Sequence, residues 1–352
     1  MAQSAPDRTL HDAYSAVETL YHAFLTGLIL STTLHKGRAT VAELVYRTFR
    51  RQHLEKFLPG LKKLGLDGLP PAVACAQYHY LSNALGGVKV EYMPESDRKA
   101  WVRYVPPRWI YMGTAVCGVP TEVSRAMLRA WHAHNGVSLN NPRLGFVCTK
   151  QTTDAQPGLE GYYREYERDL EEHERLRFAP DEEGPDFDPA LAPRVEGADW
   201  PAERLRKVQR NYAMDYVRSI LPELVGLLGA ESAAELGRFC GKQIGMQFYD
   251  DTAALLGVQG SSAEGFVDYL ARMARAQDDE CAVARTGAAL SVHQPHVRLF
   301  KGIAAPPESK LAMLQCWGGL FEGALAVHNR KCRLRFQARE DGVEWQIVGP
   351  AV

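Results

Sequence analysis

Four side chains in the first half of the chain have the chemistry needed to activate water. His134 is a candidate general base, Asp154 and Glu160 are carboxylates that could orient that base or donate a proton, and Cys148 is an alternative nucleophile. A base held by a carboxylate is a common arrangement for acid–base catalysis, and a thiol needs a nearby base to become a thiolate. If the fold brings these residues together, they predict hydrolysis without an organic cofactor.

A second group of side chains could hold a small-molecule substrate beside them. The loop 149–157 is polar and leads into a tyrosine-rich strand, so a lysine there could fix a carboxylate and tyrosines could donate to a carbonyl. The candidate binding residues are Lys150, Tyr162, Tyr163, Trp131 and His79. Each has a structural alternative: core packing for the tryptophan, an exposed strand for the tyrosines, and a helix surface for the histidine.

A signature that occurs twice supplies an internal comparison for these candidates. Residues 120–131 and 306–317 share the pattern P-x-E-x-x-x-A-M-L-x-x-W. Shorter matches keep the same order at slightly different offsets, among them Leu64-Gly65 with Leu256-Gly257. An offset that drifts while the order is kept is typical of a duplicated domain with small insertions. The sequence therefore predicts two diverged copies of one unit.

Differences between the copies single out His134. Its counterpart is Leu320, on the predicted helix stripe that also carries the methionine and the tryptophan. A histidine in place of a buried leucine costs free energy unless its ring finds partners, and such a departure from pattern is where function is expected. A buried histidine bonded to a backbone carbonyl is the structural alternative. His132, whose counterpart is Gly318, is expected to face solvent.

The same comparison favours structural roles for two other candidates. Cys148 has Phe336 as its counterpart, which favours a buried filler over a nucleophile. Glu160 recurs as Glu344 in the second copy. A role repeated in both copies is more easily explained by the scaffold than by a single active site.

No metal site is expected, although a metalloenzyme that uses histidines is kept as an alternative. His132 and His134 are two residues apart and point to different sides of a helix. His293 and His296 could reach one ion from a turn, but no third ligand at a recognisable spacing accompanies them.

The elements that must position these residues follow from the hydrophobic pattern. In the first copy it predicts helices over 10–34, 40–64, 71–85 and 121–134, and strands near 88–93, 99–105, 143–149 and 159–167. In the second copy it predicts helices over 203–228, 232–256, 262–276 and 307–328, and strands over 281–287, 289–300, 332–337 and 343–348. Each copy is thus expected to be an α+β unit, several helices packed on an antiparallel sheet.

Three segments are predicted: a first copy at 1–166, an acidic, proline-rich linker or arm at 167–202, and a second copy at 203–352. The middle segment is typical of a surface excursion. The alternative is an arm that wraps the other copy or a second subunit, so a homodimer is possible.

Composition narrows the class of protein. The 352 residues carry a net charge of −1, so no nucleic-acid or membrane-surface partner is expected. The apolar run 23–30 is too short to cross a bilayer, and residues 1–9 do not have the pattern of a secretory signal. Seven cysteines without C-x-x-C spacing predict reduced thiols in a cytoplasmic protein.

Two stretches resemble a known family. The run N-P-R-L-G-F-V-C at 141–148, with G-L-E-G-Y-Y at 158–163, is similar to sequence in L-2-amino-thiazoline-4-carboxylic acid hydrolase-like proteins. The ending H-N-R-K-C-R-L-R-F at 328–336 resembles the closing hairpin of that group and of the related 4-vinyl reductase ligand-binding domains. The resemblance implies a hydrolase that opens a small heterocycle at a C–S or C–N bond, on a ligand-cavity fold of helices over a sheet.

Two functions therefore stand against each other. The first is a hydrolase for a small cyclic amide, thioamide or thiazoline, and the second is a binding protein with an apolar cavity for an aromatic or lipid-like ligand. Convergence of His134, Asp154 and Cys148 on one pocket favours the enzyme. An apolar cavity with His134 bonded to backbone favours the binding protein.

Overall fold

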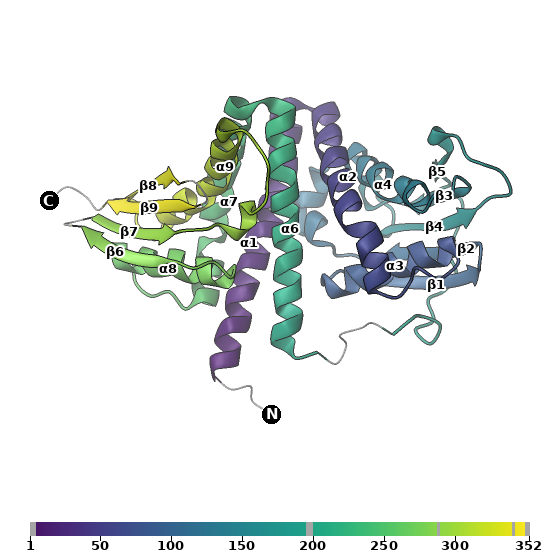
Figure 1. Ribbon diagram of the computed structural model, residues 1–352, viewed down its shortest axis with the longest axis horizontal. Helices are drawn as coiled ribbons and strands as arrows, with labels where there is room; N and C mark the ends of the chain where they lie inside the picture. The colour runs from purple at the N-terminus through teal and green to yellow at the C-terminus, as the bar shows by residue number, and fades with distance from the viewer. Residues whose placement is uncertain (1–4, 195–199, 287–288, 340–341, 349–352) are drawn as a thin grey trace. The chain divides into compact units, whose positions relative to one another are not determined.

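The structure is a computed structural model that describes residues 5–194, 200–286, 289–339 and 342–348. The chain forms two compact units, one made of residues 1–31 together with 201–352, and the other of residues 32–200. The first helix, α1 (Ala5–Lys36), therefore gives most of its length to the unit that holds the C-terminal half of the chain. Figure 1 follows the chain through both units by colour.

The 32–200 unit contains a five-stranded sheet A. Its helices are α2 (Arg38–Lys63), α3 (Pro71–Leu85), α4 (Thr121–Ala130) and α5 (Asn135–Ser138), and its strands are β1 (Val90–Ser96), β2 (Lys99–Tyr104), β3 (Leu144–Lys150), β4 (Leu159–Glu165) and β5 (Leu176–Phe178). The strand order is β1-β2-β4-β3-β5, antiparallel except for the last pair. Helix α3 and the segment from α4 to α5 cover one face of this sheet, and α2 packs on α4.

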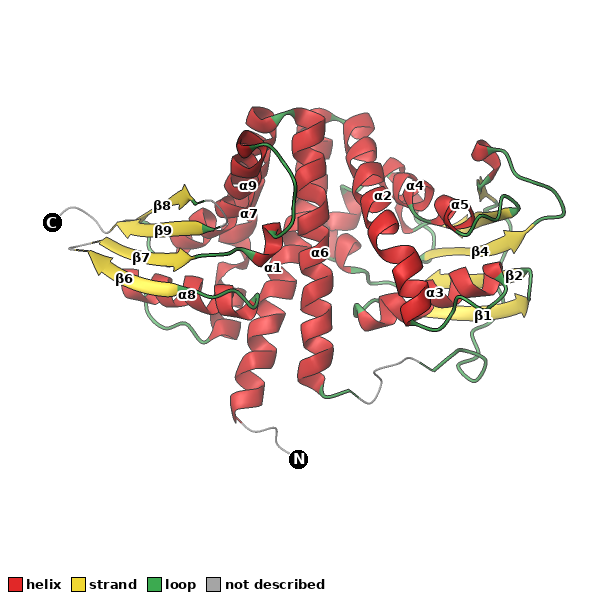
Figure 2. Cartoon of the chain, viewed as in Figure 1, coloured by secondary structure: helices red, strands yellow, loops and turns green. Residues whose placement is uncertain are grey.

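The 1–31/201–352 unit contains a four-stranded sheet B. Its helices beyond α1 are α6 (Ala202–Leu228), α7 (Ala230–Leu256), α8 (Ala263–Ala276) and α9 (Pro307–His328), and its strands are β6 (Ala282–Thr286), β7 (Ala289–Gln294), β8 (Arg333–Ala338) and β9 (Val343–Val348). Helices α8 and α9 pack on the sheet, and α7 packs on α9. Figure 2 distinguishes the strands of each sheet from the helices beside them.

The order of strands confirms the predicted fold class, an α+β unit that occurs twice. Sheet B has the order β6-β7-β9-β8, which repeats β1-β2-β4-β3 of sheet A in sequence order and in antiparallel pairing. The registers correspond as well, because Cys148 lies opposite Gly161 in one sheet and Phe336 lies opposite Trp345 in the other. The two positions that the sequence comparison paired are thus equivalent in the sheets.

Small residues bring α7 and α9 into backbone contact. Gly237, Gly241 and Gly245 recur every fourth residue on the face of α7 that meets α9. A Cβ atom at Gly245 would lie 1.9 Å from the carbonyl oxygen of Leu320, so any larger residue would push the helices apart. This close packing fixes α9 relative to the rest of its unit. The helix predicted over 232–256 therefore packs within the chain along this face.

The helix predicted over 121–134 is shorter than expected. Helix α4 ends at Ala130, and residues 132–134 form a tighter 3-10 turn before α5 begins. The tighter winding changes the direction in which the following side chains point, because a 3-10 turn holds three residues rather than 3.6. Its equivalent α9 continues without a break to His328.

In its described part, the acidic segment after residue 166 packs on its own unit. Its strand β5 pairs with β3 and extends sheet A. Residues beyond β5 cover the second face of the same sheet, where Ala179 and Phe187 pack on a buried apolar cluster made of Met93, Trp101, Val147 and Tyr162. That apolar face needs a cover, and the arm supplies it from the same unit.

No helix in the part of the chain that the structure describes is long and apolar enough to cross a membrane.

Candidate functional site

Three predicted binding residues meet on the helix-covered face of sheet A. His79 on α3, Trp131 after α4 and Tyr163 on β4 belong to one aromatic cluster, in which the imidazole of His79 lies 6.2 Å from the indole and 5.8 Å from the phenol ring. His79 and Tyr163 are buried and Trp131 is half-buried, so the structural alternative for His79, a position on a helix surface, is wrong. The other polar side chains that belong to this cluster were not predicted from the sequence as site residues.

Six residues form what we call the histidine–tyrosine network: His53, His79, Tyr104, His132, Asn135 and Tyr163. The side-chain amide of Asn135 donates to the Tyr163 oxygen at 2.9 Å, which leaves the Tyr163 hydroxyl hydrogen to be donated to Nδ1 of His132 at 2.6 Å. The carbonyl oxygen of the same amide accepts from Nε2 of His53 at 3.0 Å. Tyr104 and Nδ1 of His79 lie 2.9 Å apart, and the His79 ring stacks on His132 at 4.2 Å.

Burial keeps these imidazoles neutral. The pKa of His53 and of His79 is lowered to about 3, mainly by desolvation and in smaller part by the positive charge of Arg50 on His53 and of Arg108 on His79. The pKa of His132 is lowered well below its usual value by the same cause. Bases this weak abstract protons poorly at neutral pH. The network is therefore better suited to hold Tyr163 and the core in one arrangement than to perform general-base catalysis.

The structure reverses the predicted environments of two histidines. His132, expected to face solvent, is 5% exposed and packs on Phe146 at 4.4 Å. His134, expected on the buried stripe, is half-buried, and its Nδ1 shares a hydrogen bond of 2.8 Å with the carbonyl oxygen of Arg129. The early end of α4 is the physical reason, because the 3-10 turn directs residue 132 rather than residue 134 toward the sheet.

Cys148 lies on the same side of sheet A as the network, among buried apolar residues. Its thiol donates to the carbonyl oxygen of Lys150 at 3.4 Å, and burial raises its pKa to about 12. A thiol with this pKa is almost entirely protonated near neutral pH, so it lacks the thiolate that a nucleophile requires. These contacts correspond to the buried filler that the sequence comparison favoured.

Three further predicted residues lie on the opposite face of sheet A and hold the arm. The Lys150 ammonium donates to the carbonyl oxygens of Pro180 and Glu182 at 2.8 and 3.1 Å. The Glu160 carboxylate accepts from the backbone of Gly184 at 3.1 Å and pairs with Arg103 at 2.5 Å. Tyr162 belongs to the apolar cluster beneath the arm. In this arrangement all three tie the chain to itself.

Asp154 lies in a third place, at a cavity of ≈ 600 Å³ between the start of α4 and the β3–β4 hairpin. Its carboxylate accepts from the Gln151 amide at 2.7 Å and lies 3.8 Å from the Arg125 guanidinium. The cavity is where the sequence placed the site, but His134 and Cys148 are absent from its lining. The predicted catalytic residues are thus distributed over the network face, the arm face and this cavity.

A second and larger cavity lies at the matching edge of the other unit. We call it the α9 cleft: a hollow of ≈ 1370 Å³ bounded by residues 296–305, the first turns of α9, and the β8–β9 hairpin. The small cavity of the 32–200 unit is bounded by the equivalent parts, residues 116–119, the start of α4, and the β3–β4 hairpin. Both copies therefore open at the same edge of their sheets, and the opening is much larger in the second copy.

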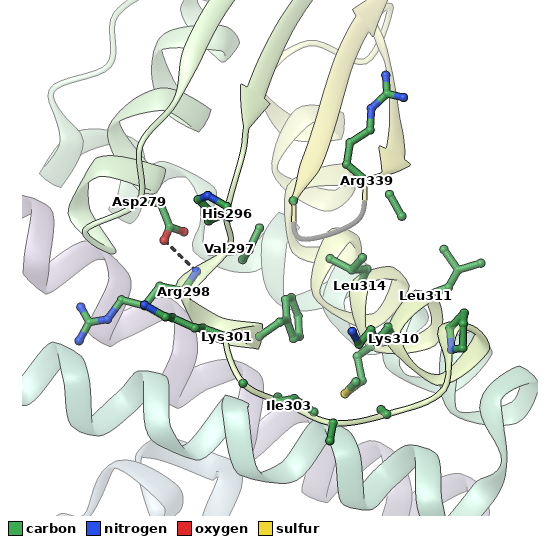
Figure 3. A pocket seen from close by; sticks show the side chains of 18 of the residues that line it. Asp279, His296, Val297, Arg298, Lys301, Ile303, Lys310, Leu311, Leu314 and Arg339 are labelled. Atoms are coloured by element: carbon green, nitrogen blue, oxygen red, sulfur yellow. Dashed lines mark hydrogen bonds between the residues drawn. The ribbon is translucent and has the colours of Figure 1, made fainter.

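Apolar side chains from α9 form one wall of the cleft. Figure 3 shows Leu311 and Leu314 on this wall, with Ile303 on the loop below them. The loop is fixed to α6 because the Arg218 guanidinium donates to the carbonyl oxygens of Leu299 and Lys301, at 3.3 and 2.6 Å. These hydrogen bonds fix the position of the loop, and therefore the shape of the cleft.

Charged groups line the remaining walls. Lys301 and Lys310 form no ion pair with any residue that the structure describes, whereas Arg298 is paired with Asp278 at 2.8 Å and Arg339 with Glu344. Of the three carboxylates in the lining, Asp278 has ion pairs, whereas Asp279 and Glu280 have none among the same residues. Two free ammonium groups thus face an apolar wall.

Asp279 is the most perturbed acid of the cleft. Its carboxylate is buried, and it accepts from the backbone N–H of Arg298 at 2.9 Å (Figure 3) and from the amide of Gln294 at 3.4 Å. Burial raises its pKa to about 6, against the opposing effect of those donors. A carboxyl group that titrates near neutral pH inside a cleft is a candidate acid–base group. The sequence offered little sign of it, because Asp279 sits in an acidic run (278–280) that is typical of a solvated turn.

No group of three or more histidine, cysteine or acidic residues in the described chain is arranged to hold a metal ion. Neither a family model, nor a curated protein, nor a solved structure matches the sequence or the fold.

Proposed function

We propose that this protein binds a small organic anion with an apolar body in the α9 cleft. The observation that carries the proposal is the combination of the Leu311–Leu314 wall with two unpaired lysines in one cavity of ≈ 1370 Å³. Binding sites for small molecules are concave and mostly apolar, with a few polar groups that fix orientation. The volume suits a ligand larger than a single ring, and the lysines favour a carboxylate or phosphate at one end.

The test is a binding series that separates charge from apolar area. We expect decanoate and 2-naphthoate to raise the thermal midpoint of the 1–31/201–352 unit, and decanol and decylamine to do so much less, because only the acids reach the lysines with a negative charge. Lys310→Gln should weaken 2-naphthoate binding by about 5- to 30-fold, as expected for the loss of one charged hydrogen bond. Lys331→Gln, at an exposed lysine outside the cleft, serves as the matched control.

Two results contradict the proposal. One is the absence of any midpoint change with either acid at millimolar concentration. The other is equal binding by the wild type and by Lys310→Gln, which would place the ligand elsewhere.

A second function is favoured by one observation, the raised pKa of Asp279 within the same cleft. We infer that, if the bound molecule is a cyclic amide, thioamide or thiazoline, the ionised Asp279 could take a proton from water as it attacks the ring. The hydrolase predicted from the sequence then has its base in the second copy, rather than at His134 with Asp154, Glu160 or Cys148 in the first.

Three variants separate the two positions for the active site. On a heterocycle that the wild type hydrolyses, Asp279→Asn should lower kcat by at least about 100-fold if Asp279 is the general base. His134→Gln and Asp154→Asn should then stay within about threefold of the wild type. The opposite ranking supports the first copy as the site, and a panel of such heterocycles without turnover removes the hydrolase altogether.

A further inference from the structure

Arg108 is buried without a partner. It follows β2 in the 32–200 unit, it is 7% exposed, and its Nε atom is buried without a hydrogen bond. Its guanidinium makes no ion pair or hydrogen bond with any residue in the described ranges. Its one polar contact is the face of the Tyr104 ring, whose centroid lies 4.8 Å away. Most of the residue is shielded from water, and no counter-ion among the described residues pairs with its charge.

Two other arginines, Arg210, which is buried, and Arg103, which is half-buried, have counter-ions. Arg210 is fully buried and pairs with Asp278 at 2.9 Å while donating to the side chain of Asn211 at 2.8 Å. Arg103 lies between Glu91 and Glu160. Removing a guanidinium from water is costly unless an anion or several acceptors replace the lost hydration. Arg108 lacks the counter-ion that these two arginines have.

In the other unit, the arginine at the equivalent position has a counter-ion. Arg298 occupies the corresponding loop, between the second strand of sheet B and the helix that follows, and Asp278 neutralises it at 2.8 Å. Among the described residues of the 32–200 unit, no acidic side chain takes the place of Asp278. The missing counter-ion is therefore specific to this copy.

The surroundings of Arg108 indicate which kind of anion would neutralise its charge. Its guanidinium stacks on the ring of Tyr104, and the imidazoles of His79 and His132 lie 6.4 and 6.3 Å from that same ring. The two imidazoles are neutral, so one guanidinium supplies the only positive charge that these groups offer. A guanidinium can bind a carboxylate through two parallel hydrogen bonds, and its single charge neutralises that monoanion, whereas a phosphate dianion would keep one uncompensated charge.

We propose that Arg108 anchors a second binding site, specific for a small aromatic carboxylate, in the 32–200 unit. The carboxylate pairs with the guanidinium, and the ring of the ligand packs among Tyr104 and Tyr111. This site involves none of the residues of the α9 cleft, so the two proposals can be tested independently.

The experiment compares benzoate, acetate and inorganic phosphate at constant ionic strength. It uses the Lys301→Gln, Lys310→Gln double variant as the background, so that binding in the α9 cleft does not contribute to the measured thermal midpoint. We expect benzoate to raise the midpoint of the 32–200 unit, acetate to raise it less, and phosphate to have no effect beyond that of chloride. Arg108→Met should lose the benzoate response. Without ligand it should also raise the midpoint by roughly 2 to 4 °C, because an uncompensated buried charge has been removed.

The last result separates a binding role from a structural one, since an arginine that merely packs would leave a less stable protein when replaced. Arg164→Met is the matched control: Arg164 also stacks on a tyrosine, Tyr166, but is exposed. Arg108→Lys keeps the charge and loses the fork, so its affinity for benzoate should fall at least tenfold. The proposal is overturned if benzoate affects the background and the Arg108→Met protein equally, or affects neither.

Should either Arg108 variant fail to fold, crystals of the wild type soaked in 4-bromobenzoate decide the matter. Anomalous bromine density beside the Arg108 guanidinium supports the site. Density elsewhere, or none at saturating ligand, refutes it.

Discussion

Mild acid is expected to unfold the 32–200 unit through its buried imidazoles. The pKa of His53 and of His79 is about 3 in the folded chain, against 6.5 for a histidine in water. Because the folded pKa is the lower one, the neutral rings stabilise the fold fully above pH 6.5, and this contribution is lost as the pH falls toward 3. At pH 5 each ring then lowers the free energy of unfolding by about 2 kcal/mol relative to pH 8, so the pair lowers it by roughly 4 kcal/mol. His132 acts in the same direction.

A loss of this size is a large part of the stability of an ordinary domain. The assay is urea unfolding at pH 8 and pH 5, followed by pulse proteolysis, with the fragments identified by mass so that each unit is read separately. His79→Gln should be less stable than the wild type at pH 8, because it loses ring stacking and a buried hydrogen bond. Its further loss between pH 8 and pH 5 should be about 2 kcal/mol smaller than that of the wild type.

His293→Gln is the matched control, since His293 is an exposed histidine outside the network. Its response to pH should equal that of the wild type. If the wild type and His79→Gln lose the same stability between pH 8 and pH 5, His79 is not neutral in the folded chain, and the assignment of the network as an uncharged one is wrong.

Three other perturbations have defined outcomes. Asp279 has a folded pKa raised from 3.8 to about 6, so its contribution to stability is complete below pH 3.8 and is lost as the pH rises through 6. Asp279→Asn should abolish roughly 2.4 kcal/mol of this decline, measured by urea unfolding from pH 4 to pH 7. Iodoacetamide should label Cys117, which is exposed, at least about 100-fold faster than Cys148 in the native protein, and comparable rates by peptide mass would show that Cys148 is accessible. Glu160→Gln should loosen the arm at Gly184 and speed limited proteolysis near it by about tenfold, and an unchanged cleavage rate would mean that other contacts hold the arm.

Element positions were largely predictable because they depend on local periodicity. Helices predicted over 40–64 and 71–85 correspond to α2 and α3 within a residue or two, and the strands predicted over 332–337 and 343–348 correspond to β8 and β9. The internal repeat made these predictions stronger, since the same pattern had to fit twice. The early end of α4 was not predictable in this way. No glycine or proline marks Ala130, and the turn is defined by contacts between His132 and strands far away in sequence.

The candidate site was harder to predict because its members come together from separate segments. His79, His132 and Tyr163 lie on different elements, and local pattern explains each of them equally well by a structural role. The structure of the second copy agrees with the observed position, because Gly318, the counterpart of His132, is buried close to Phe336 on the sheet-facing side. One signal in the sequence was usable: both faces of β2 and β4 are apolar, which indicates a sheet covered on both sides.

Asp279 and the arm were missed for a related reason. Acidic and proline-rich composition describes how a segment behaves when free in solvent, and it carries no information on which partner might bury it. The burial of Asp279 depends on donors from Gln294 and Arg298, and that of the arm on Lys150 and Glu160. Such partners become visible only once the fold is known.

The division of the chain has a consequence for its synthesis. Residues 32–200 form a continuous unit, whereas the other unit needs residues 1–31 together with residues that leave the ribosome only after position 200. At about 5 to 20 residues per second, the amino-terminal helix waits roughly 8 to 34 s for its partners while the inserted unit can already fold. Its apolar stripe, with Val17, Leu20 and Phe24, is exposed to chaperones or to other nascent chains throughout that interval. Slower translation of the second half would lengthen the delay and should lower the yield of native protein.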